Sequence, residues 1–316
     1  MRKMFLSGAA ALALIATATP ALAEVPESTD PIKLANFDWT GAVLDTKILA
    51  KILESYGYKV EVVNADYLAS IGTGLPTGDL TVGLEYWDTT AGEAMAEADK
   101  GGKTEKLGPL GPKAKEEWWF PEYMKEKCPG LPDWKALNDC ADAFSTAETA
   151  PKGRYLGGPV TWGGFDDERV EALGLNYEVV HAGTDANMFA ELESAYQRQA
   201  PILLWIYTPH WAPAKYKGEW VQFPEWTPEC YSDPAWGENK DLAYDCGKPH
   251  GEIWKYAWNG MKDKWPVAYK VAKAFTIDTD ELNKMSGEID LDGKTPEDVA
   301  TAWIAAHEAD WKAWAQ

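Results

Sequence analysis

Along the first hundred residues of this chain, segments with the hydrophobic pattern of a strand alternate with segments that have the pattern of a helix. Short apolar runs are separated by stretches in which apolar residues recur at helical spacing. The runs predict strands over residues 32–37, 58–63 and 80–84, and the helical stretches predict helices over 42–56 and 90–99. Gly57 follows the first helix as a C-cap glycine would. This alternation is typical of a mostly parallel sheet flanked by helices.

A second α/β unit follows a stretch rich in glycine and proline at residues 107–112, which predicts a crossover or hinge. We predict strands over 153–156, 177–181 and 202–207, helices over 166–173 and 186–199, an irregular segment over 212–250, and helices over 253–265, 266–275, 278–286 and 295–314. With 316 residues, the chain exceeds what one hydrophobic core usually supports. We therefore expect two lobes around a cleft, the first of residues 24–111 and 212–316, the second of 112–211. Ligands of such sheets lie beyond the carboxyl ends of the strands.

The N-terminus has the features of an export signal. Arg2 and Lys3 precede an apolar stretch that runs to about Ala16, and the small residues Ala21 and Ala23 flank Leu22. The apolar run is shorter than the ~18 residues of a membrane span. We expect residues 1–23 to be a signal peptide, cleaved near Ala23 and Glu24, and the mature chain to be a free monomer in the periplasm.

Charge and cysteine content limit the classes of function. A net charge of −20 argues against nucleic acid as a partner, because its phosphates are neutralised by lysine and arginine. The four cysteines, Cys128, Cys140, Cys230 and Cys246, form no CxxC pair, and only four histidines accompany them. In an oxidising compartment two disulfides are expected. Three pairings are open, and we favour the two local ones, which join cysteines adjacent in the sequence.

Tryptophan is unusually abundant, with 17 residues against eight phenylalanines. Those near the C-terminus lie at spacings typical of helix packing faces, including Trp254, Trp258 and Trp265 on the helix predicted over 253–265. Others lie where loops follow predicted strands, and ordinary core packing is the alternative for them. The candidates for a ligand-binding cleft are Trp39, Trp87, Trp162 and Trp205, together with Tyr207 on the same strand face as Trp205.

Several motifs, taken together, resemble the glycine betaine/choline family of periplasmic solute-binding proteins of ABC transporters. They are Trp39-Thr40, Leu84-Glu85-Tyr86-Trp87, Leu107-Gly108-Pro109-Leu110, Thr208-Pro209-His210-Trp211-Ala212 and Ala214-Lys215-Tyr216. The resemblance covers almost the whole mature chain. It implies a two-lobed α/β clamshell that closes on a small trimethylated amine and delivers it to a membrane permease. Aromatic faces suit such a head group, because each contributes ~0.5–2 kcal/mol as a cation–π contact.

Two departures from the family pattern bear on the ligand. In betaine-binding relatives the glycine-rich loop at residues 157–164 offers backbone N–H groups to the ligand carboxylate, but here Trp162 interrupts it. A position that carries a tyrosine in choline-binding relatives is Glu116, and we expect Glu117 beside it to be solvated. Glu116 repels a betaine carboxylate and favours a cation or an N-oxide. The chain thus most resembles the trimethylamine N-oxide-binding members of marine bacteria, with choline or glycine betaine as alternative ligands.

Other interpretations compete with this one. An acidic, tryptophan-rich exported chain is also typical of carbohydrate-active enzymes, whose paired carboxylates a sequence does not reveal, and of sugar-binding clamshell proteins. No catalytic motif is present, so we predict a binding protein that requires no cofactor. The acidic segment 223–248 resembles oxygen-rich loops that bind Ca²⁺. A solvated acidic loop is the favoured alternative there.

Overall fold

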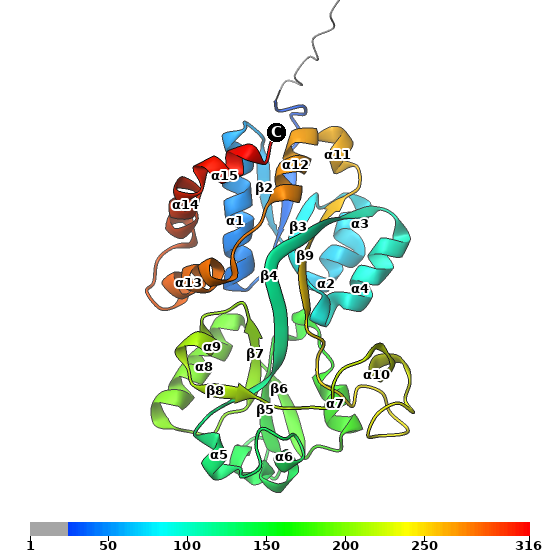
Figure 1. Cartoon of the computed structure of the whole chain (residues 1–316), viewed down its shortest axis with the longest axis vertical. Helices are drawn as coiled ribbons and strands as arrows, with labels where there is room; N and C mark the ends of the chain where they lie inside the picture. The colour runs from blue at the N-terminus through cyan, green and yellow to red at the C-terminus, as the bar shows by residue number, and fades with distance from the viewer. Residues whose placement is uncertain (1–24) are drawn as a thin grey trace, which may run out of the picture.

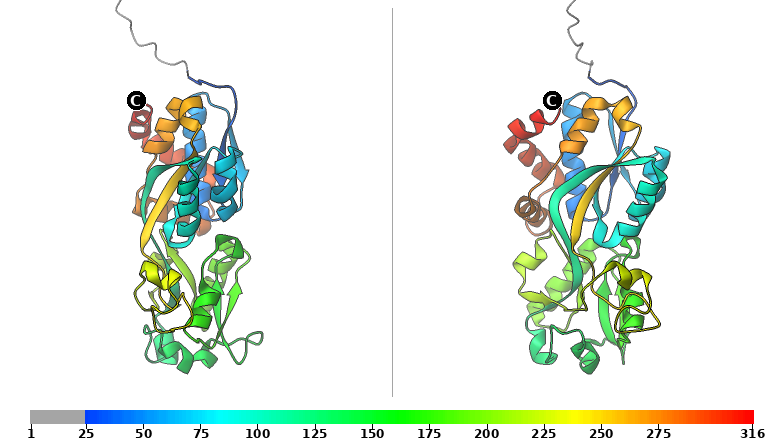
Figure 2. Two further views of the ribbon diagram at one scale, coloured as in Figure 1. Left: turned by 90° about the vertical axis from the view of Figure 1, so that its right-hand side faces the viewer. Right: turned by 45° about the vertical axis from the view of Figure 1, so that its right-hand side comes forward.

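The computed structural model describes residues 25–316, so the predicted signal peptide and its cleavage site lie outside the described residues. Figure 1 shows two lobes stacked along the long axis of the molecule. We call residues 25–112 and 251–316 the upper lobe and residues 113–250 the lower lobe. The further views in Figure 2 show that two extended segments, residues 104–121 and 251–258, run between the lobes.

One mixed sheet extends through both lobes. Its strands are β1 (Ile32–Asn36), β2 (Val60–Asn64), β3 (Val82–Trp87), β4 (Thr104–Pro121), β5 (Gly153–Gly157), β6 (Tyr177–His181), β7 (Leu204–Thr208), β8 (Gly218–Trp220) and β9 (Gly251–Trp258). The spatial order is β2-β1-β3-β9-β4-β7-β5-β6, and β8 pairs with β4. The outer groups of three strands are parallel, and β9 and β4 are antiparallel to their neighbours.

Helices cover the sheet in both lobes. In the upper lobe they are α1 (Thr40–Ser55), α2 (Tyr67–Ala69), the π-helix η1 (Ser70–Gly74), α3 (Leu75–Thr77), α4 (Asp88–Gly101), α11 (Met261–Lys264), α12 (Pro266–Ala274), α13 (Thr279–Asp290), α14 (Pro296–Ala306) and α15 (Glu308–Ala313). In the lower lobe they are α5 (Met124–Lys127), α6 (Ala136–Asp139), α7 (Asp166–Ala172), α8 (Asp185–Arg198), α9 (Ala212–Lys215), α10 (Pro228–Ser232) and the 3₁₀ turns η2 (Ala141–Phe144) and η3 (Val160–Trp162).

The predicted strand and helix alternation is confirmed in both lobes. In α1, the residues at helical spacing, such as Leu44, Ile48 and Ile52, are fully buried against the sheet. Gly57 has a φ of 89° just beyond the end of this helix, which only glycine adopts readily. All six residues of β3 are buried, because helices or neighbouring strands cover both of its faces.

The prediction of a helix over residues 253–265 is wrong, because residues 251–258 form strand β9. Its side chains Ile253, Tyr256 and Ala257 are buried between β3 and β4, with which β9 pairs on either side. The predicted crossover at 107–112 is the first half of β4, an 18-residue strand that continues from one lobe into the other. Glycine and proline are accommodated there by register shifts in the β4–β9 pairing.

The segment 212–250 packs on the lower lobe, whereas we expected it in the first lobe. Strand β8 pairs with the end of β4, where Trp119 lies opposite Trp220, and the backbone N–H of Val221 donates to the carbonyl of Trp118. The return to the upper lobe therefore occurs at Gly251, where β9 begins. Among residues 25–316, no helix has the length and apolar character needed to cross a membrane.

Candidate ligand-binding site

Trp39 and Trp87 occupy equivalent positions in the upper lobe. Trp39 is the N-cap residue of α1 just after β1, and Trp87 ends β3 and is the N-cap residue of α4. Both have extended backbone, with φ of −108° and −86°, as N-cap residues do. Two equivalent strand-to-helix turns thus place the two indoles at the carboxyl edge of the sheet.

The lower lobe contributes three further side chains. Trp162 lies on η3, which follows β5. Tyr207 lies in β7, and Glu116 of β4 is its direct cross-strand partner, so that both side chains project from the same face of the sheet. The carboxyl-edge turns of the upper lobe and the strands of the lower lobe therefore meet at the junction of the lobes.

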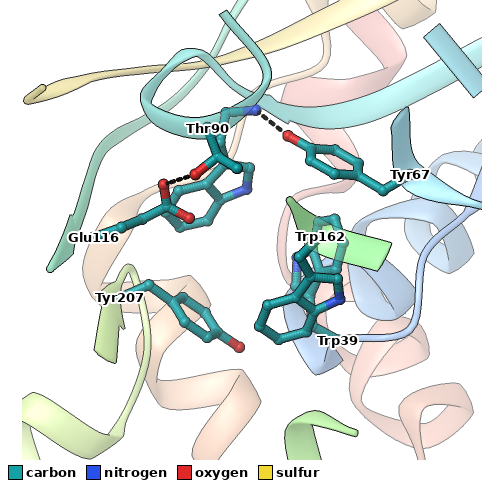
Figure 3. A pocket seen from close by; sticks show the side chains of 7 residues that line it. Trp39, Tyr67, Thr90, Glu116, Trp162 and Tyr207 are labelled. Carbon is teal, nitrogen blue, oxygen red and sulfur yellow. Dashed lines mark hydrogen bonds between the residues drawn. The ribbon is translucent and has the colours of Figure 1, made fainter. Parts of the chain in front are cut away.

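These residues line one cavity (Figure 3). Its lining is Trp39, Tyr67, Trp87, Thr90, Glu116, Trp162 and Tyr207. The free space between them is about 290 Å³, including the part that is open to solvent. Aromatic rings take up most of the boundary of this space, so the cavity suits a very small ligand.

The aromatic rings stand nearly perpendicular to one another, as the walls of a box do. The ring planes of Trp39 and Trp162 meet at 77° with centroids 5.5 Å apart, and those of Trp87 and Tyr207 meet at 89° with centroids 5.6 Å apart. Trp162 and Tyr207 close a further corner at 83°. Ring faces thereby enclose the space from several sides, an arrangement suited to a cationic or positively polarised head group.

Hydrogen bonds hold the polar ends of these rings away from the cavity. The indole N–H of Trp162 donates to Asp38 across the lobe junction, at 2.7 Å between Nε1 and Oδ1. The hydroxyl of Tyr207 donates to Asp185, at 2.9 Å between Oη and Oδ1. The hydroxyl of Tyr67 accepts the backbone N–H of Trp87 at 2.7 Å. The rings therefore turn apolar faces rather than polar groups toward the cavity.

Among the residues that line the cavity, Glu116 is the only carboxylic acid. Its side chain is buried, and the hydroxyl of Thr90 donates to its Oε2 across the lobe junction (Figure 3). The hydroxyl of Thr89 donates to the same oxygen. Burial raises the pKa of Glu116 above its ordinary value, while the charge of Lys248 and the two hydroxyls partly oppose that rise. The carboxyl therefore keeps a proton to higher pH than an exposed glutamate, and its Oε1 accepts no hydrogen bond from residues 25–316.

A comparison with known protein families identifies the family of this chain. The family model of the substrate-binding domain of ABC-type glycine betaine transport systems matches residues 30–306, nearly the whole described chain. The chain belongs to this family. It is accordingly the solute-binding component of an ABC transporter of the glycine betaine/choline type, and its two-lobed α/β fold is the one that the sequence predicts.

Individual relatives agree with this assignment. The trimethylamine N-oxide-binding protein of Pelagibacter ubique (strain HTCC1062) is 30% identical over 317 residues, which cover 98% of each chain. An ABC-transporter choline-binding protein in complex with choline has the same fold, with a TM-score of 0.71 at 21% identity and 92% of each chain covered. Lactococcal OpuAC, in its closed-liganded conformation with glycine betaine, has a TM-score of 0.68 at 19% identity over 91% of this chain and 100% of its own.

Five of the six predicted site residues of this family member line the cavity, and Trp205 does not. Trp205 lies behind Trp162, with ring centroids 6.2 Å apart, and the ammonium of Lys248 lies 4.2 Å from the Trp205 ring centroid. Of these two candidates on one strand face, Tyr207 is therefore the one that reaches the cavity. The sequence reasoning missed Thr90 and Tyr67, although Tyr67 follows β2 just as Trp39 follows β1.

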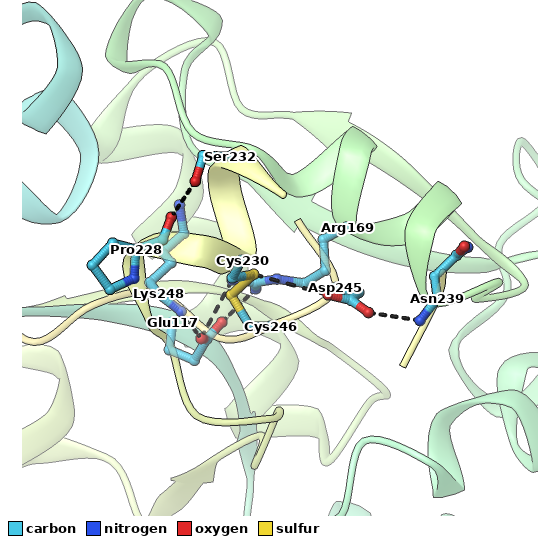
Figure 4. The surroundings of a disulfide bond; sticks show 9 residues. All are labelled: Glu117, Arg169, Pro228, Cys230, Ser232, Asn239, Asp245, Cys246 and Lys248. Atoms are coloured by element: carbon cyan, nitrogen blue, oxygen red, sulfur yellow. Dashed lines mark hydrogen bonds and ion pairs between the residues drawn. A yellow bond between two sulfur atoms is a disulfide. The ribbon is translucent and has the colours of Figure 1, made fainter. Parts of the chain in front are cut away.

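Glu117, which we expected to be solvated, is buried instead. It forms an ion pair with Arg169, at 2.6 Å between Oε1 and Nη1, and accepts the backbone N–H of Lys248 at 2.8 Å (Figure 4). Adjacent strand residues point to opposite faces, so Glu116 faces the cavity and Glu117 faces the interior of the lower lobe. The arginine compensates the buried charge of Glu117.

The two local disulfides are confirmed. Cys128 pairs with Cys140 and Cys230 pairs with Cys246, which closes loops of 12 and 16 residues. Both lie in the lower lobe. The second one anchors the segment that carries Lys248 (Figure 4). The ammonium of Lys248 lies over the ring of Trp205, and its charge acts on Glu116.

The acids of the 223–248 segment do not converge on one point. Within residues 25–316, a single group of three acidic or histidine side chains has ligand atoms within 4.8 Å of one another, and it comprises Asp185, His210 and Asp290. There the backbone N–H of Ala212 donates to Nδ1 of His210, so that Nε2 carries the proton and points toward the acids. This group suits hydrogen bonding better than metal ligation, and calcium binding by the 223–248 segment stays a prediction.

Proposed function

We propose that this protein binds trimethylamine N-oxide in the box formed by Trp39, Trp87, Trp162 and Tyr207, with Glu116 as its polar contact. One observation carries the proposal: a single buried carboxyl, with its pKa raised, faces a cavity that is otherwise walled by aromatic rings. The relative named as a trimethylamine N-oxide-binding protein supports the same ligand.

The chemistry of the N-oxide fits both parts of the cavity. Its three methyl groups carry diffuse positive charge and donate no strong hydrogen bond, so aromatic faces can surround them without leaving a polar group unpaired. Its single oxygen is a strong acceptor. A protonated Glu116 donates to that oxygen, and the raised pKa keeps the donor form available to higher pH than in an exposed glutamate.

Choline and glycine betaine are the alternative ligands. The carboxylate of glycine betaine would lie close to Glu116 or to the ring of Trp162, and neither offers it a donor when Glu116 is ionised. Choline brings a full positive charge, which an ionised Glu116 would favour. Its hydroxyethyl tail, however, needs space beyond a box of about 290 Å³ in which rings occupy several sides.

The remaining parts of the proposal concern transport. The exported protein would act as a monomer in the periplasm, capture the ligand between its lobes, and deliver it to the permease of the ABC importer. Cell fractionation and N-terminal sequencing of the mature protein test the predicted export and the cleavage near Ala23 and Glu24.

A ligand panel tests the binding function directly. The protein is titrated calorimetrically, and its melting temperature is measured, with trimethylamine N-oxide, choline, glycine betaine and maltose. We expect the tightest binding and the largest thermal stabilisation with trimethylamine N-oxide. Stabilisation by maltose alone would favour a sugar-binding protein, and turnover of a glycoside would favour the carbohydrate-active enzyme. The family assignment and the solute-binding relatives argue against that enzyme.

A further inference from the structure

The two upper-lobe tryptophans of the box meet at one carboxylate that does not itself line the cavity. Glu85 lies in β3 and is 1% exposed. Its Oε2 accepts the indole N–H of Trp39 and also that of Trp87, at 3.3 Å from Nε1 of Trp87. One oxygen atom therefore fixes the direction of two indole rings, which come from two different strand-to-helix turns.

The backbone at Glu85 departs from regular strand geometry in a way that aims this side chain. Glu85 has a φ of 54°, a conformation that residues other than glycine rarely adopt. The pairing of β3 with β9 changes register between Gly83 and Tyr86, so a bulge lies at the same position. Bulges redirect side chains, and conformations of this kind persist where the surroundings favour them, often at functional sites.

Space for the carboxylate is provided by a glycine at the start of α1. A Cβ atom on Gly41 would lie 2.9 Å from Oε1 of Glu85, closer than such contacts normally come. The carboxylate thus lies against the first turn of a 16-residue helix, where the unpaired N–H groups and the helix dipole favour negative charge.

A second buried carboxyl faces the first. Asp45, on the next turn of α1, is fully buried, and residues 25–316 offer its two oxygens no N–H or O–H donor, nor any to Oε1 of Glu85. Burial, together with the neighbouring charge of Glu85, raises the pKa of Asp45 well above its ordinary value, and burial also raises the pKa of Glu85. Indole N–H donors stabilise Glu85 but not Asp45 as an anion, so a proton placed on Asp45 and directed at Oε1 of Glu85 would give a partner to oxygens that otherwise lack one.

We infer that Glu85 is a positioning residue of the binding box: its buried carboxylate orients the rings of Trp39 and Trp87 and makes their faces more attractive to a positive head group. The inference rests on the proposed function. A carboxylate that accepts an indole N–H polarises the ring toward greater electron density, which strengthens cation–π attraction. It also keeps both N–H groups out of the cavity, where they would be unpaired against methyl groups.

The variant Glu85→Gln tests the inference. Its matched control is Glu61→Gln, which removes a glutamate from the exposed face of β2 in the same sheet. Calorimetric titration with trimethylamine N-oxide should show a dissociation constant about tenfold higher for E85Q and unchanged for E61Q. A double-mutant cycle with Trp39→Phe, which removes the N–H and keeps an aromatic ring, separates positioning from general structural damage. If Glu85 acts through Trp39, the combined loss is smaller than the product of the two single losses. Independent, multiplicative losses, or an unchanged dissociation constant for E85Q, would overturn the inference.

A second pair of variants keeps the test decisive if E85Q does not fold. Asp45→Asn retains a donor to Glu85, whereas Asp45→Leu has the same branching at Cγ with larger methyl groups and no donor, so the Leu variant should bind several-fold more weakly. Equal binding by the two would refute the donation from Asp45 to Glu85. Failure of the proposed function is recognised separately, because the wild-type protein would then not bind trimethylamine N-oxide. In that case the near-ultraviolet circular dichroism of the ligand-free variants still reports whether Glu85 orients the indoles.

Discussion

The two lobes contribute to the box in different ways. In the upper lobe, Trp39 and Trp87 are anchored by Glu85 of the same lobe, so their orientation does not depend on the lower lobe. In the lower lobe, Trp162 donates to Asp38 and Glu116 accepts from Thr89 and Thr90, and all three partners belong to the upper lobe. The upper wall is therefore preorganised, as is Tyr207 through Asp185 of its own lobe, whereas Trp162 and Glu116 of the lower wall acquire these hydrogen bonds only when the lobes meet. Ligand binding and lobe closure are coupled through the lower wall.

The largest effect is expected from removal of a preorganised ring. Trp39→Ala should raise the dissociation constant for trimethylamine N-oxide by about 100-fold, because it removes a desolvated cation–π contact of ~2 kcal/mol together with the packing of a buried ring. Isothermal titration measures the change. Trp236→Ala, at a half-buried tryptophan outside the cavity, is the control and should bind as the wild type does. Equal losses at both positions would contradict the location of the box.

Glu116→Gln should weaken binding of trimethylamine N-oxide about tenfold, since it removes the acidic donor of the lower wall. The raised pKa of Glu116 also predicts in which direction the affinity changes with pH. Because the pKa of Glu116 is raised, its protonated form is present at low pH and is lost as the pH rises through that pKa. Affinity for the N-oxide should therefore fall as the pH rises through the raised pKa of Glu116, and affinity for choline should rise over the same range. Parallel trends for the two ligands, or a slope that persists in E116Q, would exclude this role.

A smaller effect is expected from the hydrogen bond between the lobes. Asp38→Ala removes the acceptor of the Trp162 indole N–H, but Asp38 is exposed and the bond is partly accessible to water. We expect a loss of about threefold to fivefold in affinity, which corresponds to ~1 kcal/mol. Stopped-flow fluorescence should place the loss in the dissociation rate, because the bond forms only in the closed state. A loss confined to the association rate would argue against the bond as a stabiliser of closure.

The smallest effect on affinity is expected from the disulfide behind the lower wall. Replacing Cys230 and Cys246 by serine opens a 16-residue loop and should cost about 3 kcal/mol of unfolding free energy, with less than about threefold change in affinity. Hydrogen exchange should show the loss of protection in the lower lobe alone. Equal loosening of the upper lobe would contradict the independence of the two walls.

Local patterns predicted most of the elements, and long-range pairing changed two of them. Helix α1 and strand β6 match their predicted ranges closely, because their burial follows the period of their own sequence. Residues 251–258 have tryptophans at helix-like spacing, yet they form β9, because two long strands on either side satisfy its backbone groups. The return of the chain at Gly251 rather than at residue 212 likewise depends on β8, a three-residue strand too short to recognise in advance.

The sequence by itself determined the family, the two α/β units and most of the aromatic lining, and it favoured the local disulfide pairs without excluding the others. These follow from motifs and periods that neighbouring residues set. Only the tertiary structure decided that Tyr207 rather than Trp205 reaches the cavity, that Glu116 faces it while Glu117 pairs with Arg169, and that Glu85 joins two indoles. Each of these depends on which face of a strand meets residues from distant parts of the chain, and no local pattern encodes that meeting.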